Sequence, residues 1–448
     1  MFYKILTKNL WLRLGSISLV SLVIATGTFI LFDYLRPGVT ISNDGSGRPG
    51  AVGEEKNLKE RIRVAEERAQ SVKGVYMTSG VANDAGRAAT KLRSDIIKLL
   101  ETTELNGVVI DVKETEGGLI VTNGLEKLVG ELHEKGIWVI ARQAVFKDSS
   151  QEKINPQWYL KRKNGAIWRD RRGGSWLDPD SKEVWSYTLA AAKAASDAGF
   201  DEIQFDYIRF PSDGNTADIV YPFYRITRPK YEVLREFFSY AHSELKAHRP
   251  ELIISADLFG YVALESADLG IGQRLQDIGE NFDYVSLMVY PSHYYSGFGV
   301  EADPQRNLAA VFYPYKSKDI SKAAASNPYN VVYRTLLIAG DILEGRVATA
   351  TAQIDESFRP KSELGAIGKA ATSPISPPSL ISSTSSPRRA RLRPWLQSFD
   401  LGADSSRGIY YDAGKVRAQI DAAEAAGASG WLLWSPNNIY TREALKSG

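Results

Sequence analysis

Residues 200–211 read Phe-Asp-Glu-Ile-Gln-Phe-Asp-Tyr-Ile-Arg-Phe-Pro, and this stretch decides the fold class. It follows Gly199 and has the apolar spacing of a short strand, which Pro211 ends. Buried strands of parallel sheets are nearly continuous apolar runs, because an unpaired interior charge costs several kcal/mol. Asp206 and Arg209 break this rule near the strand end, and such breaks tend to mark functional sites. The pattern indicates either a structural ion pair or an active-site aspartate that Arg209 orients and keeps ionised at the mouth of a parallel barrel.

Apolar runs alternate with amphipathic helical patterns along the rest of the chain from Gly74 onward. The predicted strands are Val75–Thr78, Gly107–Val112, Trp138–Ala144, Glu202–Ile208, Leu252–Leu258, Tyr284–Tyr290, Trp395–Phe399 and Gly430–Trp434. The predicted helices are Asp84–Glu101, Leu125–Glu134, Lys182–Ala198, Tyr231–His248, Gln273–Gly279, Pro304–Ala325 and Lys415–Ala426. Eight such strands predict an α/β fold, the (β/α)8 TIM barrel. A doubly wound open sheet is the alternative, but no Gly-x-Gly-x-x-Gly follows the first strand.

The N-terminal region has the pattern of a membrane anchor. Lys4, Lys8 and Arg13 precede an apolar stretch, residues 14–32, of about the 20 residues that a transmembrane helix needs. The preceding positive charges predict a cytoplasmic N-terminus and an extracytoplasmic domain. Secretion after signal-peptide cleavage is the alternative. We therefore expect a cytoplasmic stub and anchor at 1–36, a linker and charged helix at 37–73, and the barrel at 74–448.

A low-complexity insertion interrupts the barrel pattern at about 348–394, before the seventh strand. It is rich in Ser and Pro and carries the basic residues Arg388, Arg389, Arg391 and Arg393. Such composition does not build a core, so we expect a disordered, solvated loop.

Composition excludes several classes of protein. The net charge of +2 argues against nucleic acid as a partner. The absence of cysteine excludes disulfides, thiolate zinc sites and a cysteine nucleophile. The four histidines lack zinc-ligand spacing, and neither Gly-x-Ser-x-Gly nor a Walker loop is present. We therefore expect no metal and no cofactor.

Polar residues follow several predicted strands, where barrel enzymes place their catalytic groups. Asp206 and Asp257 suit glycosidic bond cleavage, in which one carboxylate attacks or stabilises the sugar and the other protonates the leaving oxygen. Asp206 beside a guanidinium suits the nucleophile, and Asp257 after an apolar strand suits the acid/base. The predicted sugar contacts are Asp111, Arg209, Tyr290, His293, Gln397 and Trp434.

Two long predicted loops would border the same cleft. The loop at 146–179 carries Trp158, Trp168 and Trp176, and the loop at 212–228 carries further aromatic residues. Exposed indoles there would suit stacking on sugar rings, while packing of the loop onto the barrel is an equal alternative for any single Trp.

Five strings resemble those of the bacterial putative glycosyl hydrolase domain family. They are Gly-Val-Tyr-Met-Thr-Ser (74–79), Val-Ile-Asp-Val-Lys-Glu (109–114), Ile-Gln-Phe-Asp-Tyr-Ile-Arg-Phe-Pro (203–211), Ser-Ala-Asp-Leu-Phe-Gly (255–260) and Trp-Leu-Leu-Trp-Ser (431–435). The resemblance implies a (β/α)8 barrel distantly similar to alpha-amylase-type glycosidases, with the nucleophile at Asp206. Those enzymes have a Glu as acid/base where this chain has Asp257. Glu114, Glu202 and Asp400 therefore remain alternatives for the acid.

The sequence thus predicts a membrane-tethered, extracytoplasmic glycoside hydrolase that acts on a poly- or oligosaccharide. The alternative is a catalytically inactive barrel that binds carbohydrate or another part of the cell envelope. It would keep the aromatic residues without needing an acid.

Overall fold

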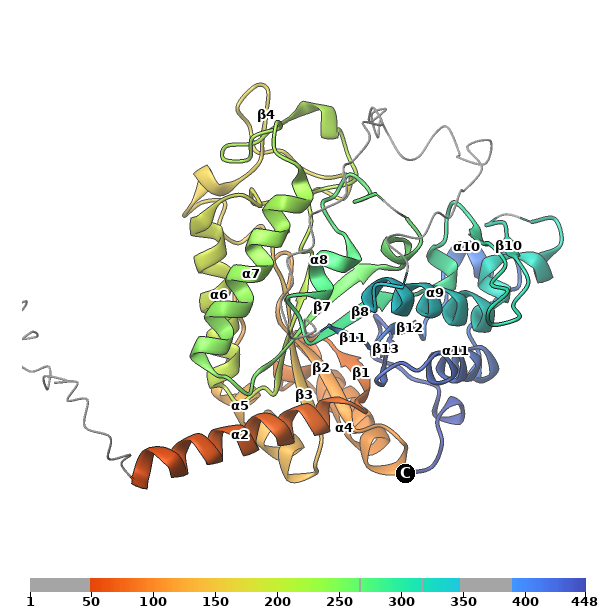
Figure 1. The fold of residues 1–448 in the computed structure, drawn as a ribbon, viewed down its shortest axis with the longest axis horizontal. Coiled ribbons are helices and arrows are strands. Elements are labelled where there is room, and N and C mark those ends of the chain that lie inside the picture. Colours follow the sequence, from red (N-terminus) through yellow and green to blue (C-terminus); the bar gives the residue numbers. More distant parts are fainter. Residues whose placement is uncertain (1–48, 266, 316, 347–388) are drawn as a thin grey trace, which may run out of the picture. The chain divides into compact units, whose positions relative to one another are not determined.

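Eight parallel strands close into a barrel in the computed structural model, which describes residues 49–265, 267–315, 317–346 and 389–448 (Figure 1). Around the barrel they are β1 (Lys73–Met77), β2 (Gly107–Lys113), β3 (Trp138–Ala144), β5 (Glu202–Asp206), β7 (Ile253–Phe259), β8 (Tyr284–Met288), β12 (Trp395–Gln397) and β13 (Trp431–Trp434). The barrel closes because β13 pairs with β1, with Trp431 opposite Lys73. The two-residue strand β11 (Arg391–Leu392) pairs with β8 beside β12. The predicted eight-stranded barrel is confirmed.

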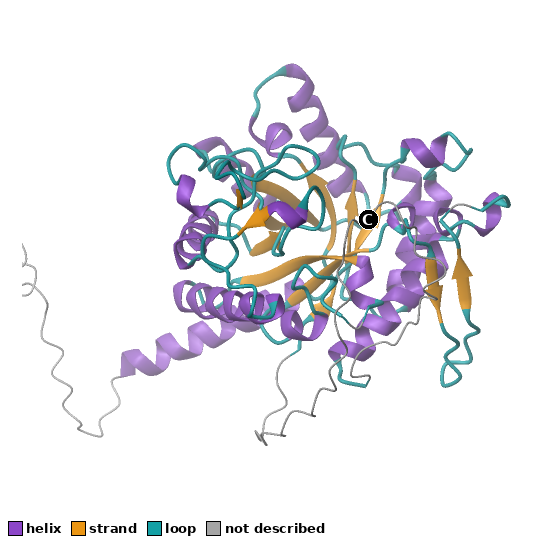
Figure 2. Cartoon of the chain, turned by 90° about the horizontal axis from the view of Figure 1, so that it is seen from above, coloured by secondary structure: helices purple, strands orange, loops and turns teal. Residues whose placement is uncertain are grey.

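Helices surround the strands, as the view from above shows (Figure 2). The helices are α2 (Pro49–Ala69), α3 (Ser79–Asn83), α4 (Arg87–Thr102), α5 (Asn123–Glu134), α6 (Lys182–Asp197), α7 (Lys230–His248), α8 (Leu275–Gly279), α9 (Pro328–Leu343), α10 (Gly402–Ser405) and α11 (Ala413–Ala425). Gly136, Gly199 and Gly427 follow α5, α6 and α11 with positive φ of 75°, 98° and 78°. These three glycines therefore end their helices in the left-handed conformation.

One predicted helix is wrong. The described residues of 304–325, which omit 316, contain no α-helix but include strand β10 (Val311–Tyr313), which pairs with β9 (Phe298–Val300) in a hairpin. The helix at this point of the barrel is α9, which begins at Pro328, where a missing N–H and a fixed φ suit the first helical position. It packs against α11 and α8.

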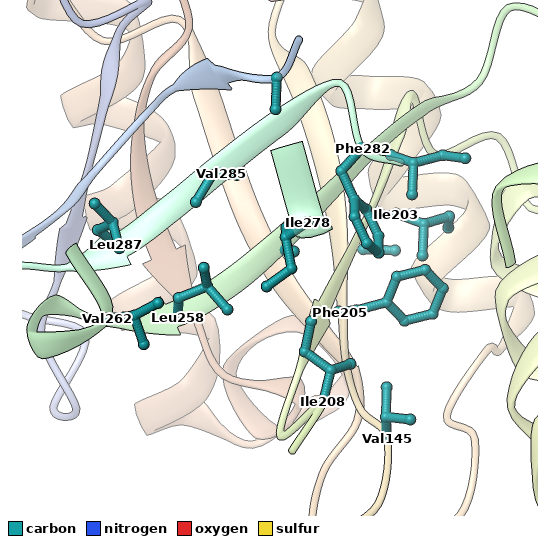
Figure 3. Packing of buried hydrophobic residues seen from close by; sticks show 14 of the residues in the cluster. Val145, Ile203, Phe205, Ile208, Leu258, Val262, Ile278, Phe282, Val285 and Leu287 are labelled. Atoms are coloured by element: carbon teal, nitrogen blue, oxygen red, sulfur yellow. The ribbon is translucent and has the colours of Figure 1, made fainter. Parts of the chain in front are cut away.

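The alternation of side chains along the strands separates two cores. Outward-facing residues such as Ile203 and Phe205 of β5 pack with Leu258 of β7, Val285 of β8 and Ile278 of α8 (Figure 3). Inward-facing residues form a separate cluster within the barrel, including Tyr76, Ile140, Trp395 and Leu432. On β5 the inward positions are Glu202, Gln204 and Asp206, so polar side chains run through the barrel interior.

The two long loops contact each other beside the barrel mouth, by which we mean the carboxyl-terminal end of the strands. Strand β4 (Lys161–Arg162) of the first loop pairs with β6 (Ile219–Val220) of the second. Trp158, Trp168 and Trp176 are at most 9% exposed. Of the two alternatives that the sequence left open for these indoles, the burial excludes exposed rings for sugar stacking and agrees with packing of the loop.

Two sequence predictions fall partly or wholly outside the described residues. The predicted membrane anchor at 14–32 lies outside them, and within the described part of the chain no helix is long and apolar enough to cross a membrane. Most of the predicted insertion, residues 348–388, also lies outside them. Its predicted last residues do not form a solvated loop, because Arg391 and Leu392 form β11 and Arg393 is fully buried.

Candidate active site

The inward positions at the ends of β2, β3, β5 and β7 bring four charged side chains together. Each strand contributes one of these residues near its carboxyl-terminal end: Asp111, Arg142, Asp206 and Asp257. Neighbouring strands pair in parallel register, with Asp111 opposite Arg142 and Ala144 opposite Asp206. The four side chains therefore meet at the barrel mouth, where enzymes of this fold place their active sites.

Arg142 is the centre of this group, and its guanidinium contacts all three carboxylates. Its Nη1 donates to Asp111 Oδ1 at 2.6 Å, its Nη2 donates to Asp206 Oδ2, and its Nε donates to Asp257 Oδ2 at 3.3 Å. A guanidinium is a rigid planar fork, so three bonds to it fix the relative positions of the carboxylates. We call Asp111, Arg142, Asp206 and Asp257 the Arg142 cluster.

Aromatic side chains hold the Arg142 cluster from three strands. Tyr76 donates its hydroxyl to Asp111 Oδ2, and Trp395 Nε1 donates to Asp257 Oδ1 at 2.8 Å. Trp434 stacks on Tyr76 with ring centres 4.0 Å apart, and the Arg142 guanidinium lies 5.0 Å from the centre of the Trp434 ring. Trp434, a predicted sugar contact, therefore belongs to the wall of the cluster.

Burial raises the pKa of two of the three carboxylates that share this guanidinium. Burial and the charge of Asp206 raise the pKa of Asp257 well above its ordinary value, against the opposing effect of Arg142. Burial also raises the pKa of Asp111. The three anions in turn raise the pKa of Arg142 against the effect of its burial. The arrangement therefore favours a proton on Asp257.

The three carboxylates differ in their access to solvent. The Asp206 side chain is 9% exposed and that of Arg142 is 12% exposed, whereas Asp257 is 1% exposed. Asp206 Oδ1 accepts the backbone N–H of Tyr207 at 2.6 Å, and Tyr207 adopts a left-handed φ of 52°. Backbone strain of this kind in a non-glycine residue is typical of functional sites. Asp206 is thus the carboxylate of the cluster that a molecule at the mouth would meet first.

The prediction that Arg209 orients Asp206 is wrong. Arg142, not Arg209, forms the ion pair with Asp206. Strand β5 ends at Asp206 and Tyr207 has a left-handed φ, so the alternation of side chains along the strand does not continue to Arg209. Arg209 Nη1 donates to Phe210 O at 3.1 Å and Ser212 Oγ at 3.2 Å. Its guanidinium lies 4.8 Å from the ring centres of both Trp176 and Phe259.

The predicted sugar contacts after β8 and β12 divide into two kinds. Tyr290 and His293 pack around Phe399, with ring centres 5.5 and 5.6 Å from it. Burial and the charge of Arg172 lower the pKa of His293 to about 4, so its ring is neutral near pH 7. Gln397 is fully buried and bonds to the backbone N–H and hydroxyl of Ser292 and to Phe399 O. The prediction of a sugar contact is wrong for Gln397, because this amide fixes the loop after β8.

The alternative acids named from the sequence lie in three different settings. Glu202 begins β5 at the opposite end of the barrel, where it is fully buried and paired with Arg393 at 2.7 Å. It therefore cannot reach the mouth. Asp400 is exposed and accepts the N–H of Tyr411 at 2.7 Å. Glu114 follows β2 and accepts the hydroxyl of Ser79. Neither has a hydrogen bond to the Arg142 cluster, although the charge of Glu114 helps to raise the pKa of Asp111.

No metal-binding group is found among the residues that the structure describes. In the Arg142 cluster the guanidinium occupies the position between the carboxylates that a cation would take. Arg142 could have been predicted from the sequence, because it is the one charged residue of β3 and follows the apolar run that begins at Trp138.

The fold and the cluster define a (β/α)8 barrel with carboxylates at the mouth, the class in which glycoside hydrolases are common. The family model of the putative glycosyl hydrolase domain matches residues 74–354 and 379–440, and the chain belongs to this family. The protein is thus of glycoside hydrolase type. The family resemblance seen in the sequence is confirmed.

One solved glycoside hydrolase domain has the same fold, and two further structures match less closely. The glycoside hydrolase domain of PgaB (BpsB) from Bordetella bronchiseptica is 14% identical, with a TM-score of 0.52 over 82% of this chain and 95% of that one. A hypothetical protein from Ruminiclostridium thermocellum is 32% identical over 41% of this chain and 96% of that one, with a TM-score of 0.35. The spore cortex-lytic enzyme SleL from Bacillus megaterium is 12% identical over 84% and 72%, with a TM-score of 0.42. No curated protein matches the chain.

Proposed function

We propose that this protein hydrolyses O-glycosidic bonds of a poly- or oligosaccharide with Asp206 and Asp257. The observation that carries the proposal is that both carboxylates bind the same guanidinium, that of Arg142. Two groups on one guanidinium are well within the separation, at most about 9.5 Å, that glycosidases use between their two carboxylates.

In this proposal Asp206 attacks or stabilises the anomeric centre. It is the most accessible carboxylate of the Arg142 cluster, and Arg142 and the Tyr207 N–H both donate to it. Donors of this kind stabilise negative charge on the carboxylate. They also hold the carboxylate at one orientation toward the sugar.

Asp257 supplies the proton to the leaving oxygen. Its raised pKa favours the protonated form, which a general acid needs. Its bond to Arg142 Nε, at 3.3 Å, is the longest of the three bonds that the guanidinium makes to the cluster. Substrate binding would break this bond, so that Asp257 turns toward the leaving oxygen.

The second candidate is a barrel that binds carbohydrate without cleaving it. The burial of Asp257, with both oxygens already bonded, favours this candidate. A structural ion cluster needs no access to substrate.

Release of reducing ends from a panel of polysaccharides separates the two candidates. We expect the wild type to release them and Asp206→Asn to lose about 10³-fold or more in rate, since it removes the nucleophile or stabiliser. Asp197→Asn, an exposed change on α6 far from the mouth, is the matched control and should keep the wild-type rate. Equal rates for wild type and Asp206→Asn, or binding with no hydrolysis by the wild type, would reject the hydrolase.

We further propose that the barrel works outside the cytoplasmic membrane, tethered by the apolar stretch at 14–32. The support is the order of charged and apolar residues in the sequence. Fusion of a periplasm-dependent reporter enzyme to the C-terminus should give activity only with residues 1–36 present. Carbonate washing and sequencing of the mature N-terminus distinguish a retained anchor from secretion after cleavage.

A further inference from the structure

Arg209 is a buried cation at the barrel mouth with no carboxylate partner among the described residues. It is 8% exposed, and the residues that surround its guanidinium are the aromatic rings of Trp176, Phe259 and, at 5.7 Å, Tyr207. Asp206 and Asp213 act on it only at a distance, and burial lowers its pKa. An arginine that is desolvated in this way gains from an anion that binds it directly.

The free edge of this guanidinium has the geometry of a carboxylate receptor. Both of its bonds within the protein are made by Nη1, to Phe210 O and Ser212 Oγ. The Nε and Nη2 atoms have no hydrogen-bond partner in the described part of the chain. Neither atom is among the fully buried nitrogen and oxygen atoms that lack a hydrogen-bond partner. Solvent therefore reaches both Nε and Nη2. The Nε–Nη2 edge of arginine is a fork that binds the two oxygens of a carboxylate together.

The position of this fork relates it to the Arg142 cluster. Arg209 follows Asp206 by three residues, and it stacks on Phe259, which ends β7 two residues after Asp257. Arg172, an exposed residue of the loop after β3, adds a second positive charge, which acts on His293 and Tyr295 after β8. Both cations offset the negative charge of the three aspartates toward an incoming anion.

We propose that the mouth binds an acidic saccharide, a sugar that carries a carboxylate, and that Arg209 receives this carboxylate on its Nε–Nη2 edge. The inference rests on the proposed function, because it names the substrate class of the same site. It concerns binding and involves no covalent step.

The test measures binding by calorimetry in the full-length Asp206→Asn chain, which keeps Arg209 and prevents turnover. The probes are three polyuronate oligosaccharides of different linkage and their carboxyl-reduced, neutral counterparts. We expect at least one acidic oligosaccharide to bind ten-fold or more tightly than its neutral counterpart, and its affinity to fall as salt is raised. Equal binding of acidic and neutral forms across the panel would overturn the proposal.

Arg209→Gln in the same background should remove the preference for the acidic form and leave affinity for the neutral form within about two-fold. Arg209→Lys keeps the charge without the fork and should restore part of the preference. Arg63→Gln removes one exposed charge from α2 and is the matched control. A preference that survives Arg209→Gln would contradict the assignment. If Arg209→Gln does not fold, the ratio of the affinities for acidic and neutral oligosaccharides in the Asp206→Asn chain, and the salt dependence of this ratio, still test the proposed substrate class.

Failure of this inference and failure of the proposed function give different results. Equal binding of acidic and neutral forms by the Asp206→Asn chain, with hydrolysis of neutral glycans by the wild type, would reject only the role of Arg209. Hydrolysis at the wild-type rate by Asp206→Asn would reject the proposed mechanism. The comparison of acidic and neutral oligosaccharides would still test the role of Arg209 in binding.

Discussion

At the scale of the residue, the chemistry of this site comes from the sharing of one cation by three anions. Each aspartate of the Arg142 cluster is almost fully buried, and one guanidinium bonds to all of them. The free-energy cost of burying several negative charges together is reduced when one of the carboxylates takes up a proton. The environment therefore favours a proton on Asp257.

A pH profile of kcat/KM tests the protonated state proposed for Asp257. The pKa of Asp257 is raised, so the protonated acid persists below that raised pKa and is lost as the pH rises through it. We therefore expect activity to extend from acidic toward neutral pH and then to fall on a basic limb. Asp257→Asn should cost about 10²–10⁴-fold and remove that limb. A basic limb at the same pH in Asp257→Asn would assign the acid to another residue.

At the level of residues, the sequence predicted the position of three carboxylates at strand ends but not the cation that binds them. The positions of Asp111, Asp206 and Asp257 at strand ends follow from the apolar runs before them. The partner was sought at Arg209, three residues from Asp206 in sequence, whereas Arg142 reaches it from the neighbouring strand. Pairing across a sheet depends on register, and local spacing in one strand does not contain that information.

At the scale of the element, the segment that enters β12 is fixed by a buried ion pair. Arg393 Nη1 bonds to both oxygens of Glu202, at 2.9 and 2.7 Å, and its Nη2 donates to Ala69 O. Trp138 Nε1 donates to the same carboxylate at 3.0 Å. This pair joins α2, β3, β5 and β12 at the amino-terminal end of the barrel.

Arg393→Met should therefore lower the free energy of unfolding by about 3–5 kcal/mol, because it leaves Glu202 buried without its counter-ion. Denaturation in urea, followed by circular dichroism, measures the change. Arg391→Met, at an exposed position two residues earlier, is the control and should change stability by about 0.5 kcal/mol or less. A loss no larger for Arg393→Met than for Arg391→Met would show that the pair contributes nothing.

Element boundaries near the low-complexity segment were the least predictable part of the fold. Composition alone assigned Arg393 to a solvated loop, although a single buried partner decides its position. The helix predicted at 304–325 was wrong for a related reason. Strand β10 pairs with β9, which lies before the predicted helix in sequence. A helical pattern within residues 304–325 contains no information on that pairing.

At the scale of the whole molecule, the barrel was predictable because its eight strands repeat one signal. Each strand is a short apolar run, and an error in the bounds of one element does not change the number of predicted strands. The interior is a different case. Inward polar residues from Glu202 to the Arg142 cluster depend on partners from distant strands, which only the closed barrel brings together.

The most direct test of the central claim compares two leaving groups on the sugar that the polysaccharide panel identifies. Aryl glycosides with a strongly activated leaving group need no acid, whereas those with a poor leaving group do. Asp257→Asn should lose about 10²-fold or more on the poor leaving group and keep most of the rate on the activated one. Asp206→Asn should lose the rate on both. Full activity of Asp206→Asn on either glycoside would contradict the account.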